Sequence, residues 1–425
     1  MSGKFAAKLE IKGYDDGRNT IEGSYDFKQA RFVVPLLQIV KPVGMAAQGR
    51  SRIELRNQRI VSVPRFELDA PVIKAEGRAQ FHGDGVTIRL LRIDKLVAGR
   101  TNLTANIKGT TKGAKTVTLT GEALDLQPLL KASEKKPEGK EEEKTPPTEL
   151  LANLARVYFA PDRYVDAVKG KLHHDGARWR RISVFGKVGA KAAPFSIDYA
   201  AGAKGRTLKA RSADAGAALR ALNIADEIRG GRLDLGGSEP AGGKRKGLAG
   251  NITIENFRVS KAPTMARLLA LASQQGLANW ASSDKGIEFK EFKARFRSMD
   301  GLLYLSDARA VGSQVGFTFA GAINLEKDTA KLNGTVVPLY SLNSAISKVP
   351  LLGRVLVGEK GGGILAVRYS VNGPLKNPQI TVNPLSMLTP GLLRKLFDIG
   401  NATPTPEDEK PKAPDVLKRD PRYER

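Results

Sequence analysis

Residues 101–109 read TNLTANIKG, and residues 115–126 read KTVTLTGEALDL. In the first segment the apolar residues Leu103, Ala105 and Ile107 alternate with Thr, Asn and Lys. Successive side chains of a β-strand point to opposite faces, so a period of two predicts strands with one apolar face and one polar face. Such strands are typical of antiparallel sheets that bury only one side.

The same alternation recurs along the chain, at Phe66/Leu68, Val86/Ile88/Leu90, Val117/Leu119, Leu124/Leu126, Ile252/Ile254, Phe292/Phe296, Phe317/Phe319 and Ile323/Leu325. Turn dipeptides separate many of these segments, at Asp16-Gly17, Asp84-Gly85, Asp300-Gly301, Asn333-Gly334 and Asn372-Gly373. We therefore expect a mainly β fold, an elongated, curled antiparallel β-sheet with a few short amphipathic helices. The alternation leaves open whether the apolar face lines a groove or forms the core of a closed sandwich.

Composition divides the chain into a β-rich repeat region (1–130), a charged disordered linker (131–147), a β-rich segment with helices (148–247), a C-terminal domain (248–400) and a disordered tail (401–425). The linker reads KASEKKPEGKEEEKTPP, which has too few apolar residues to build a core. Helices are expected at 148–160, 214–228, 262–281, 341–347 and 390–399, and a flexible loop at 236–247. Asp214 is the expected N-cap of the second helix.

The chain carries 69 Lys and Arg against 44 Asp and Glu, for a formal net charge of +25. The linker and the tail are each neutral, so the excess lies on the folded segments. A basic folded surface suits anionic phospholipid or lipopolysaccharide headgroups, or nucleic acid, and it is also compatible with a generic solubilising surface. Few aromatic residues and the lack of a recognition helix or zinc module argue against nucleic acid.

No segment resembles a membrane span or a signal peptide. The longest apolar run, Phe32–Val43, is broken by Pro35, Lys41 and Pro42 and falls well short of the roughly 18 residues that a span needs. We therefore expect a chain that either is soluble or lacks its N-terminal part. Cysteine is absent, which excludes disulfides and thiolate chemistry from this sequence.

No pattern predicts a catalytic, cofactor or metal site. The three histidines are His82, His173 and His174, and the adjacent pair would point to opposite faces of a strand. The glycine-rich segment at 237–244 lacks the first glycine of a phosphate loop, since Ser238 stands there, and Arg245 stands where that loop needs Ser or Thr. We expect a protein that is not an enzyme and has no cofactor.

The C-terminal part resembles the AsmA-like C-terminal domain family, in the branch of the YhdP-type bacterial envelope proteins. The matching blocks occur in order: Asn256–Val259, Ala262-Pro263, Gly286–Phe289, Asp300-Gly301, Val311–Ser313, Leu332–Tyr340, Val349–Gly353, Val371–Leu375, Val382–Ser386 and Thr389–Arg394. Upstream, Gly121–Leu130 resembles a strand-to-helix phrase repeated in the same proteins. The resemblance extends over most of the chain from Val86 to Ile399.

This resemblance implies a bridge-like envelope protein that contributes to phospholipid transport between the inner and outer membranes, and so to outer-membrane biogenesis. The full-length protein would be periplasmic and associated with the inner membrane, and the resemblance implies that this chain, which shows no signal peptide or anchor, is a C-terminal fragment of such a protein. The implied partners are phospholipid or another anionic envelope lipid, the membrane surface and other envelope proteins. An assembly factor for outer-membrane proteins fits the same family, and a basic nucleic-acid-binding protein is the weaker alternative.

The apolar residues of the C-terminal strands are the candidates for lining a lipid groove, and they are Phe289, Phe292, Phe296, Leu303, Leu305, Phe317, Phe319, Ile323, Leu325, Val367 and Tyr369. The alternative is that each is ordinary sandwich core. The helix expected at 390–399 would touch a membrane or cap the groove through Leu392, Leu393, Arg394, Lys395, Leu396 and Phe397.

Overall fold

The computed structural model describes residues 1–34, 37–134, 145–242, 247–260, 286–312, 315–338, 367–375 and 377–383. Strands make up most of these residues, as the alternation predicts. In chain order the described elements are β1 (Ser2–Gly3), β2 (Ala6–Gly13), β3 (Arg18–Asp26), β4 (Ala30–Val34), β5 (Ile39–Lys41), β6 (Gln48–Arg56), β7 (Arg59–Ala70), β8 (Ile73–Phe81), β9 (Ile88–Ala98), β10 (Thr101–Gly109), β11 (Lys115–Asp125), α1 (Gln127–Glu134), β12 (Thr148–Ala160), β13 (Arg163–His174), β14 (Trp179–Val188), β15 (Ala193–Gly202), β16 (Gly205–Ser212), α2 (Ala215–Ala221), β17 (Ile228–Pro240), β18 (Leu248–Val259), β19 (Ile287–Met299), β20 (Leu302–Gly312), β21 (Val315–Asn324), β22 (Thr329–Pro338), β23 (Val367–Pro374) and β24 (Gln379–Asn383).

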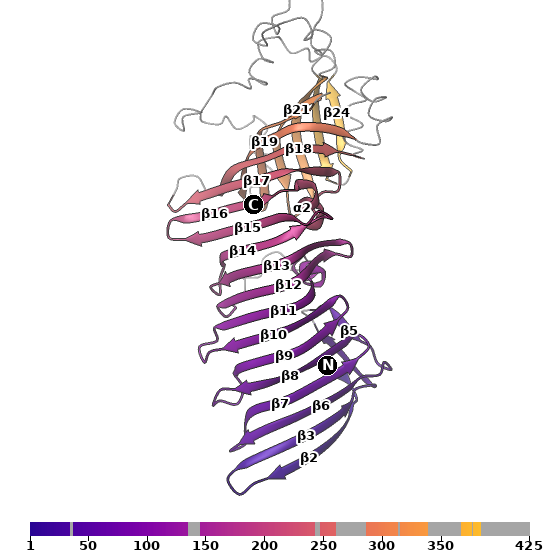
Figure 1. Ribbon diagram of the computed structural model, residues 1–425, viewed down its shortest axis with the longest axis vertical. Helices are drawn as coiled ribbons and strands as arrows, with labels where there is room; N and C mark the ends of the chain where they lie inside the picture. Colours follow the sequence, from indigo (N-terminus) through magenta and orange to yellow (C-terminus); the bar gives the residue numbers. More distant parts are fainter. Residues whose placement is uncertain are drawn as a thin grey trace, which may run out of the picture.

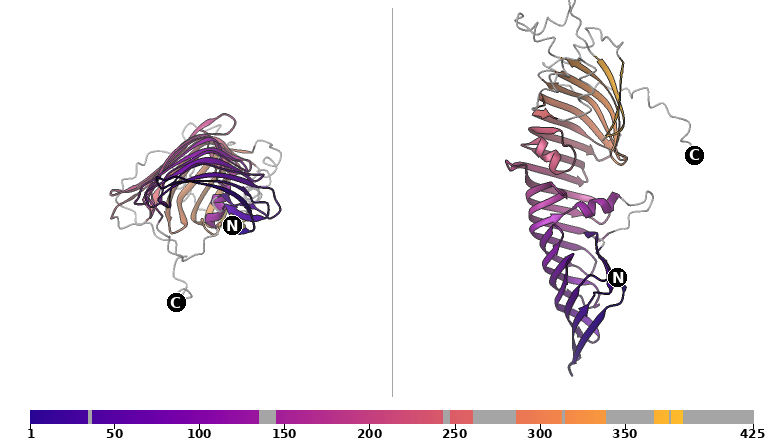
Figure 2. Two further views of the ribbon diagram at one scale, coloured as in Figure 1. Left: turned by 90° about the horizontal axis from the view of Figure 1, so that it is seen from below. Right: turned by 90° about the vertical axis from the view of Figure 1, so that its right-hand side faces the viewer.

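One long sheet forms the body of the molecule, and each of its strands pairs with the next one along the chain (Figure 1). The order runs from β2 through β3 and β6 to β24, and the pairs are antiparallel except for β11 with β12. Within the described residues β2 pairs only with β3, and β24 only with β23, so the sheet is open at both ends. Its strands bend into an arch when the sheet is viewed from one end (Figure 2). We call the two sides of the arch the hollow face and the outer face.

The predicted turns explain much of the antiparallel order. Gly17, Gly85 and Gly301 adopt φ values of 77°, 72° and 72°, a region that glycine enters without steric cost. In the second of these turns the carboxylate of Asp84 accepts hydrogen bonds from the backbone N–H groups of Val86 and Thr87, both at 2.9 Å. Short turns of this kind return the chain beside the strand that it has just left.

Bulges keep apolar residues on the hollow face as the strands bend. In β20 the register shifts between Leu305 and Ala308, where Asp307 has a φ of 49°. The extra residue allows Leu305 and Ala308 to be buried on the same face although they are three positions apart. A shift in β13, with Ala167 at a φ of 50°, has the same effect on Val165 and Val168.

The small additional elements all lie on the hollow face (Figure 2). A three-stranded sheet of β1, β4 and β5 packs through Phe32, Val34 and Ile39 against the ends of β7, β8 and β9. Helix α1 follows β11, and helix α2 packs on β17 and β13 through a face that includes Leu219. These elements follow one long edge of the arch, which we call the capped margin.

The opposite edge, which we call the open margin, consists of hairpin turns. It is formed by the turns that join β2 to β3, β6 to β7, β8 to β9, β10 to β11, β13 to β14 and β15 to β16. In Figure 1 these turns follow the left side of the sheet, whereas α2 and β5 lie on the right. The two long edges of the arch therefore differ in structure, since one carries the small additional elements and the other consists of hairpin turns.

The helix expected at 148–160 is wrong, because these residues form strand β12. Leu150, Ala152 and Leu154 are three of its residues on the hollow face, where Leu154 is 2% exposed. The strand pairs with β11 on one side and β13 on the other, and two complete ladders outweigh the modest helix preference of its Leu and Ala residues.

Other sequence predictions need smaller corrections. The second predicted helix is shorter than 214–228, since α2 ends at Ala221 and β17 begins at Ile228, although the side chain of Asp214 caps α2 as expected. The start of the loop expected at 236–247 belongs to β17, which continues to Pro240. Asn333-Gly334 lies inside β22 and Asn372-Gly373 inside β23, so neither dipeptide forms the predicted turn. In the linker, Lys131–Glu134 complete α1.

Several predictions fall outside the described residues. They are the helices at 262–281, 341–347 and 390–399, the middle of the linker at 135–144 and the tail at 401–425. Within the part of the chain that the structure describes, no helix is long and apolar enough to cross a membrane.

Candidate functional site

The register of the ladder assigns each side chain to one face. Between β10 and β11, Ala105 pairs with Leu119 and Ile107 with Val117, and both pairs lie on the hollow face with the buried residue Leu103. The intervening pairs place Thr, Asn and Lys on the outer face. The alternation in the sequence therefore translates directly into a groove with an apolar floor.

The apolar floor continues along the whole described sheet. The register of the paired strands places a series of apolar residues on the hollow face. They are Ile21, Ile53, Phe66, Leu68, Leu91, Ile93, Leu119, Leu150, Leu172, Ile182, Ile197, Leu208, Leu235 and Ile252. We call this surface, together with its C-terminal continuation, the groove floor. Each of these side chains is only partly buried. Within the described residues the small sheet of β1, β4 and β5 packs against Leu68, and no second sheet extends over the rest of these residues, so the described structure favours the groove over the closed sandwich.

Most of the predicted lining residues lie together on the C-terminal part of the floor. Phe296 pairs with Leu305, Leu303 with Ile323, and the register of β19 to β23 places Phe289, Phe292, Phe317, Phe319 and Tyr369 on the same face. The rings of Phe257 and Phe289 stack with centroids 5.2 Å apart, and those of Phe292 and Phe319 stack at 6.0 Å. Whether these residues contact lipid stays a prediction.

Two predicted lining residues differ from the rest. Leu325 lies beyond the end of β21 and is 53% exposed, so it is part of a turn rather than of the floor. The side chain of Asn324 ends the strand, because its Oδ1 accepts hydrogen bonds from the backbone N–H groups of Glu326 and Lys327. For Val367 only the backbone, which pairs with Val336, is described. The candidate cap residues Leu392, Leu393, Arg394, Lys395, Leu396 and Phe397 lie outside the described residues.

Tyr369 is the one ionisable side chain among the predicted lining residues. Its ring covers Gly334, and its hydroxyl donates a hydrogen bond of 3.2 Å to the backbone oxygen of Thr318. Burial raises the pKa of Tyr369 above its ordinary value. The phenol therefore stays neutral at physiological pH and adds no charge to the floor.

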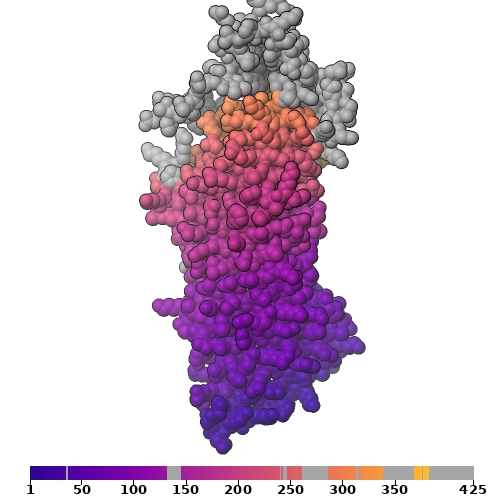
Figure 3. All heavy atoms as spheres, in the orientation of Figure 1, coloured from indigo at the N-terminus to yellow at the C-terminus, as the bar shows by residue number. Residues whose placement is uncertain are grey.

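The outer face carries many charged residues, and the described strands form a continuous wall on this side (Figure 3). Arg156 lies 3.8 Å from the ring centroid of Tyr164 and 2.6 Å from a carboxylate oxygen of Asp166. This hydrogen bond to Asp166 is the main reason that the pKa of Arg156 is raised. Contacts of this type link neighbouring strands, and their charged groups keep the outer face hydrated.

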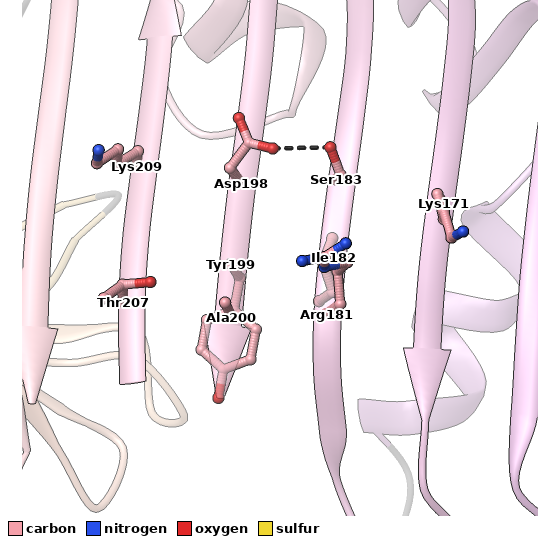
Figure 4. Close-up of a pocket in the computed structure, with 9 residues that line it drawn as sticks. All are labelled: Lys171, Arg181, Ile182, Ser183, Asp198, Tyr199, Ala200, Thr207 and Lys209. Carbon is pink, nitrogen blue, oxygen red and sulfur yellow. Dashed lines mark hydrogen bonds between the residues drawn. The ribbon is translucent and has the colours of Figure 1, made fainter. Parts of the chain in front are cut away.

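A shallow depression of about 450 Å³ lies on the outer face across β13 to β16. The polar atoms around it come from Lys171, Arg181, Lys209 and Asp198 (Figure 4). The hydroxyl of Ser183 donates a hydrogen bond of 2.7 Å to Asp198, and Lys171 pairs with Glu149 at 3.2 Å. The depression can attract an anion, but it has no apolar floor for an acyl chain.

The histidines are arranged as the sequence predicts. His173 and His174 lie on opposite faces of β13, and Nε2 of His82 is 3.0 Å from the backbone oxygen of Gly109. Among the residues that the structure describes, no group of three or more His, Cys, Asp or Glu could hold a metal ion.

Sequence reasoning located only part of the candidate site. It named lining residues in the C-terminal strands, whereas the floor also runs through the strands before Val259. The same alternation signalled these strands, but their equivalence follows only from the unbroken order of pairing. It also missed the capped margin, which depends on contacts such as those of Phe32 with the main sheet.

Comparison with known proteins supplies one match. The family model described as the YhdP protein matches residues 193–380, somewhat under half of the chain. This region contains the aromatic part of the groove floor and helix α2. No curated protein and no solved structure matches the chain.

Proposed function

Residues 193–380 are of the AsmA/YhdP type, a class of cell-envelope proteins, and from this premise we propose that the chain carries phospholipid along its groove. The proposed role is transport between the inner and outer membranes, in the periplasm, by a protein whose full-length form is associated with the inner membrane. No chemical step, metal or cofactor is required, because the lipid only changes its position.

The observation that carries the proposal is the unbroken apolar floor of an open sheet. Burying acyl chains is worth about 0.8 kcal/mol per methylene group, so a partly exposed floor of Leu, Ile, Val and Phe holds them well. The floor keeps the same chemistry from one strand to the next, as in Ile107, Leu119 and Leu150. A lipid that leaves one strand therefore regains equivalent contacts on its neighbour. A passive groove of this kind has no preferred direction, which must come from elsewhere.

The second candidate is an assembly factor for outer-membrane proteins. The observation that favours it is the free edge of β2, whose eight residues are all exposed and which pairs only with β3 in the described chain. A free edge can accept another strand by backbone hydrogen bonding. It does not explain why the hollow face stays apolar over so many strands, and we rank it second.

Site-specific photocrosslinking tests the transport proposal. A photoreactive amino acid at Leu119, on the floor, should crosslink phospholipid in a detergent-free preparation, because acyl chains would lie against it. The matched control is the adjacent residue Thr120, which faces outward. Equal crosslinking at both positions, or no phospholipid detectable by mass spectrometry together with tight, salt-sensitive DNA binding, would contradict the proposal.

A further inference from the structure

Rows of side chains run across strands β13 to β17 on the hollow face, and their burial differs from row to row. The register of these strands defines the rows, because residues that pair across the ladder lie side by side on one face. From the capped margin toward the open margin we call them the sealed row, the two lane rows and the border row.

The sealed row is packed and closed to a ligand. Phe195 pairs with Ser212 and Ser212 with Leu233, and these side chains are only 3%, 3% and 8% exposed. Helix α2 packs on this side of the sheet, and its residues Ala218 and Ala221 belong to the same buried cluster as Phe195. An acyl chain gains little at this row, since its apolar surface is already removed from water.

The two lane rows are uncharged and only partly buried. On β13 to β17 the row next to the sealed row consists of Gly170, Val184, Ile197, Ala210 and Leu235, and the following row of Leu172, Ile182, Tyr199, Leu208 and Gly237. Both rows continue onto the flanking strands, where Leu172 pairs with Leu150 of β12 and Leu235 with Ile252 of β18. We call this accessible strip of the groove floor the lane.

Charged side chains bound the lane on the side of the open margin. The border row consists of His174, Arg180, Ala201, Arg206 and Glu239. Arg180 forms an ion pair with Asp175, and Arg206 forms one with Glu239. The second carboxylate oxygen of Glu239 accepts a hydrogen bond of 2.9 Å from the backbone N–H of Gly247. An acyl chain laid over these ion pairs would remove them from water, which is costly.

The lane is too narrow for an acyl chain that lies parallel to the strands. Its two rows are alternate residues of each strand, so they lie about 7 Å apart. One acyl chain extends over half of a bilayer core, which is about 15 Å. Perpendicular to the strands the lane continues without interruption, and the same length corresponds to about three strand spacings of roughly 4.8 Å.

The geometry points to acyl chains that lie lengthwise in the lane, across successive strands, rather than from the open margin toward the capped margin. This inference rests on the proposed function, and it adds which residues of the floor touch the lipid and how the lipid lies. A chain contacts both lane residues of a strand, such as Ile182 and Val184 of β14, and then their partners Tyr199 and Ile197 on β15.

Depth-dependent quenching tests how the chains lie. Because the chain has no cysteine, a fluorescent label can be attached to a single introduced cysteine. Ile182→Cys and Val184→Cys place it on the two lane rows of one strand, and Ser183→Cys between them places it on the outer face as a control. The protein is loaded with phosphatidylcholine that carries a nitroxide either near the headgroup or near the end of one acyl chain.

Lengthwise chains should give the same ratio of quenching by the two nitroxide lipids at Ile182→Cys and Val184→Cys, because both rows then meet the same parts of the chain. Chains that entered crosswise from the open margin would favour the headgroup-proximal nitroxide at Ile182→Cys, which is nearer that margin. Ser183→Cys should be quenched little by either lipid.

Three alanine-to-tryptophan variants test the lane itself. Ala210→Trp fills the lane between Ile197 and Leu235, Ala201→Trp lies in the border row, and Ala200→Trp lies on the outer face. Transfer of phosphatidylglycerol between vesicles should fall roughly ten-fold in Ala210→Trp, since lifting about two methylene groups off the floor is worth about that factor. The other two variants should transfer as wild type, and circular dichroism checks that all three fold.

Three results would overturn the inference and leave the proposed function intact. They are a higher headgroup-proximal ratio at Ile182→Cys than at Val184→Cys, a loss of transfer in Ala201→Trp as large as that in Ala210→Trp, and normal transfer by a folded Ala210→Trp variant. If the wild-type protein transfers no lipid, the proposed function fails, and this inference fails with it.

Discussion

Glycines on the groove floor allow aromatic rings to lie flat against the sheet. At Gly334 an added Cβ would collide with the backbone oxygen of Thr318 and lie 2.6 Å from the ring of Tyr369, and at Gly77 it would collide with the backbone oxygen of Arg92 and lie 2.8 Å from the ring of Phe66. In both places the missing side chain makes room for a ring from a neighbouring strand. The rings cover backbone that a glycine would otherwise expose.

Gly334→Ala should therefore destabilise the protein by about 1–3 kcal/mol, the usual cost of overpacking a fitted site. The measurement is the free energy of unfolding from a urea titration. Gly236→Ala in β17 is the control, because an added Cβ there meets nothing within 4 Å. A loss at Gly236 as large as that at Gly334 would show that glycine flexibility, rather than crowding by Thr318 and Tyr369, decides the effect.

At the scale of single residues the sequence predicts the face of a side chain only within an uninterrupted strand. Phe317 and Phe319 share a face as expected. The bulge at Asp307 shifts the alternation by one residue, and no dipeptide signals it. Leu325 continues the pattern of Ile323 in the sequence, but the capping bonds of Asn324 end the strand before it.

At the scale of elements, the small sheet of β1, β4 and β5 is held by an unusual buried cation. Lys41 is 0% exposed, and its ammonium group donates hydrogen bonds to the backbone oxygens of Phe27, Lys28 and Ala30. The Lys28 and Ala30 bonds measure 2.9 and 2.7 Å. A buried charge is tolerated when its hydrogen-bonding capacity is filled in this way.

Lys41→Met should detach this element, since three buried carbonyl groups lose their donor. The expected loss is about 3–5 kcal/mol of local stability, the usual cost of removing one partner from a buried charged network. Hydrogen exchange should rise sharply in Ala30–Val34 and remain unchanged in β14 and β15. Lys74→Met is the control, because its ion pair with Asp69 is exposed. Unchanged protection of Ala30–Val34 would refute this role of Lys41.

Element type was predicted correctly where turns flank a strictly alternating segment, and incorrectly at 148–160. That segment contains Leu, Ala and Arg at spacings that suit a helix as well as a strand. The parallel pairing of β12 with β11 decides between them, and it depends on residues more than 30 positions apart. Local pattern cannot contain that information.

At the scale of the whole molecule, alternation predicts an antiparallel sheet but not whether it closes. A groove and a sandwich present the same apolar positions to the same side of each strand. The difference lies in the order of pairing, which here runs from neighbour to neighbour without returning to the first strand in the described residues. The C-terminal apolar residues could thus be named, but the sequence did not decide between groove lining and core, and Phe289, Phe296 and Phe317 are buried, with 2%, 6% and 3% of their surface exposed.

A conduit should fail when any single step along it is blocked. Leu119→Glu places a charge on the floor at mid-length, so we expect lipid transfer between donor and acceptor vesicles to fall at least ten-fold, because each acyl chain must pass the carboxylate. Thr120→Glu changes the outer face by the same charge and should transfer normally. Circular dichroism checks that both variants fold. Normal transfer by a folded Leu119→Glu variant would mean that lipid does not pass along the floor.

Because each strand of the main sheet pairs with its neighbours along the chain, the length of the sheet is proportional to the number of strands. Strands in a sheet lie about 4.8 Å apart, so the 21 strands joined in the described ladder span on the order of 100 Å. Each hairpin contacts chiefly the strands on either side of it, and such an arrangement can gain or lose a repeat without rebuilding the others. Each added or removed hairpin would change the reach by roughly 10 Å and leave the cross-section unchanged. The length of the sheet is therefore set by the number of hairpins.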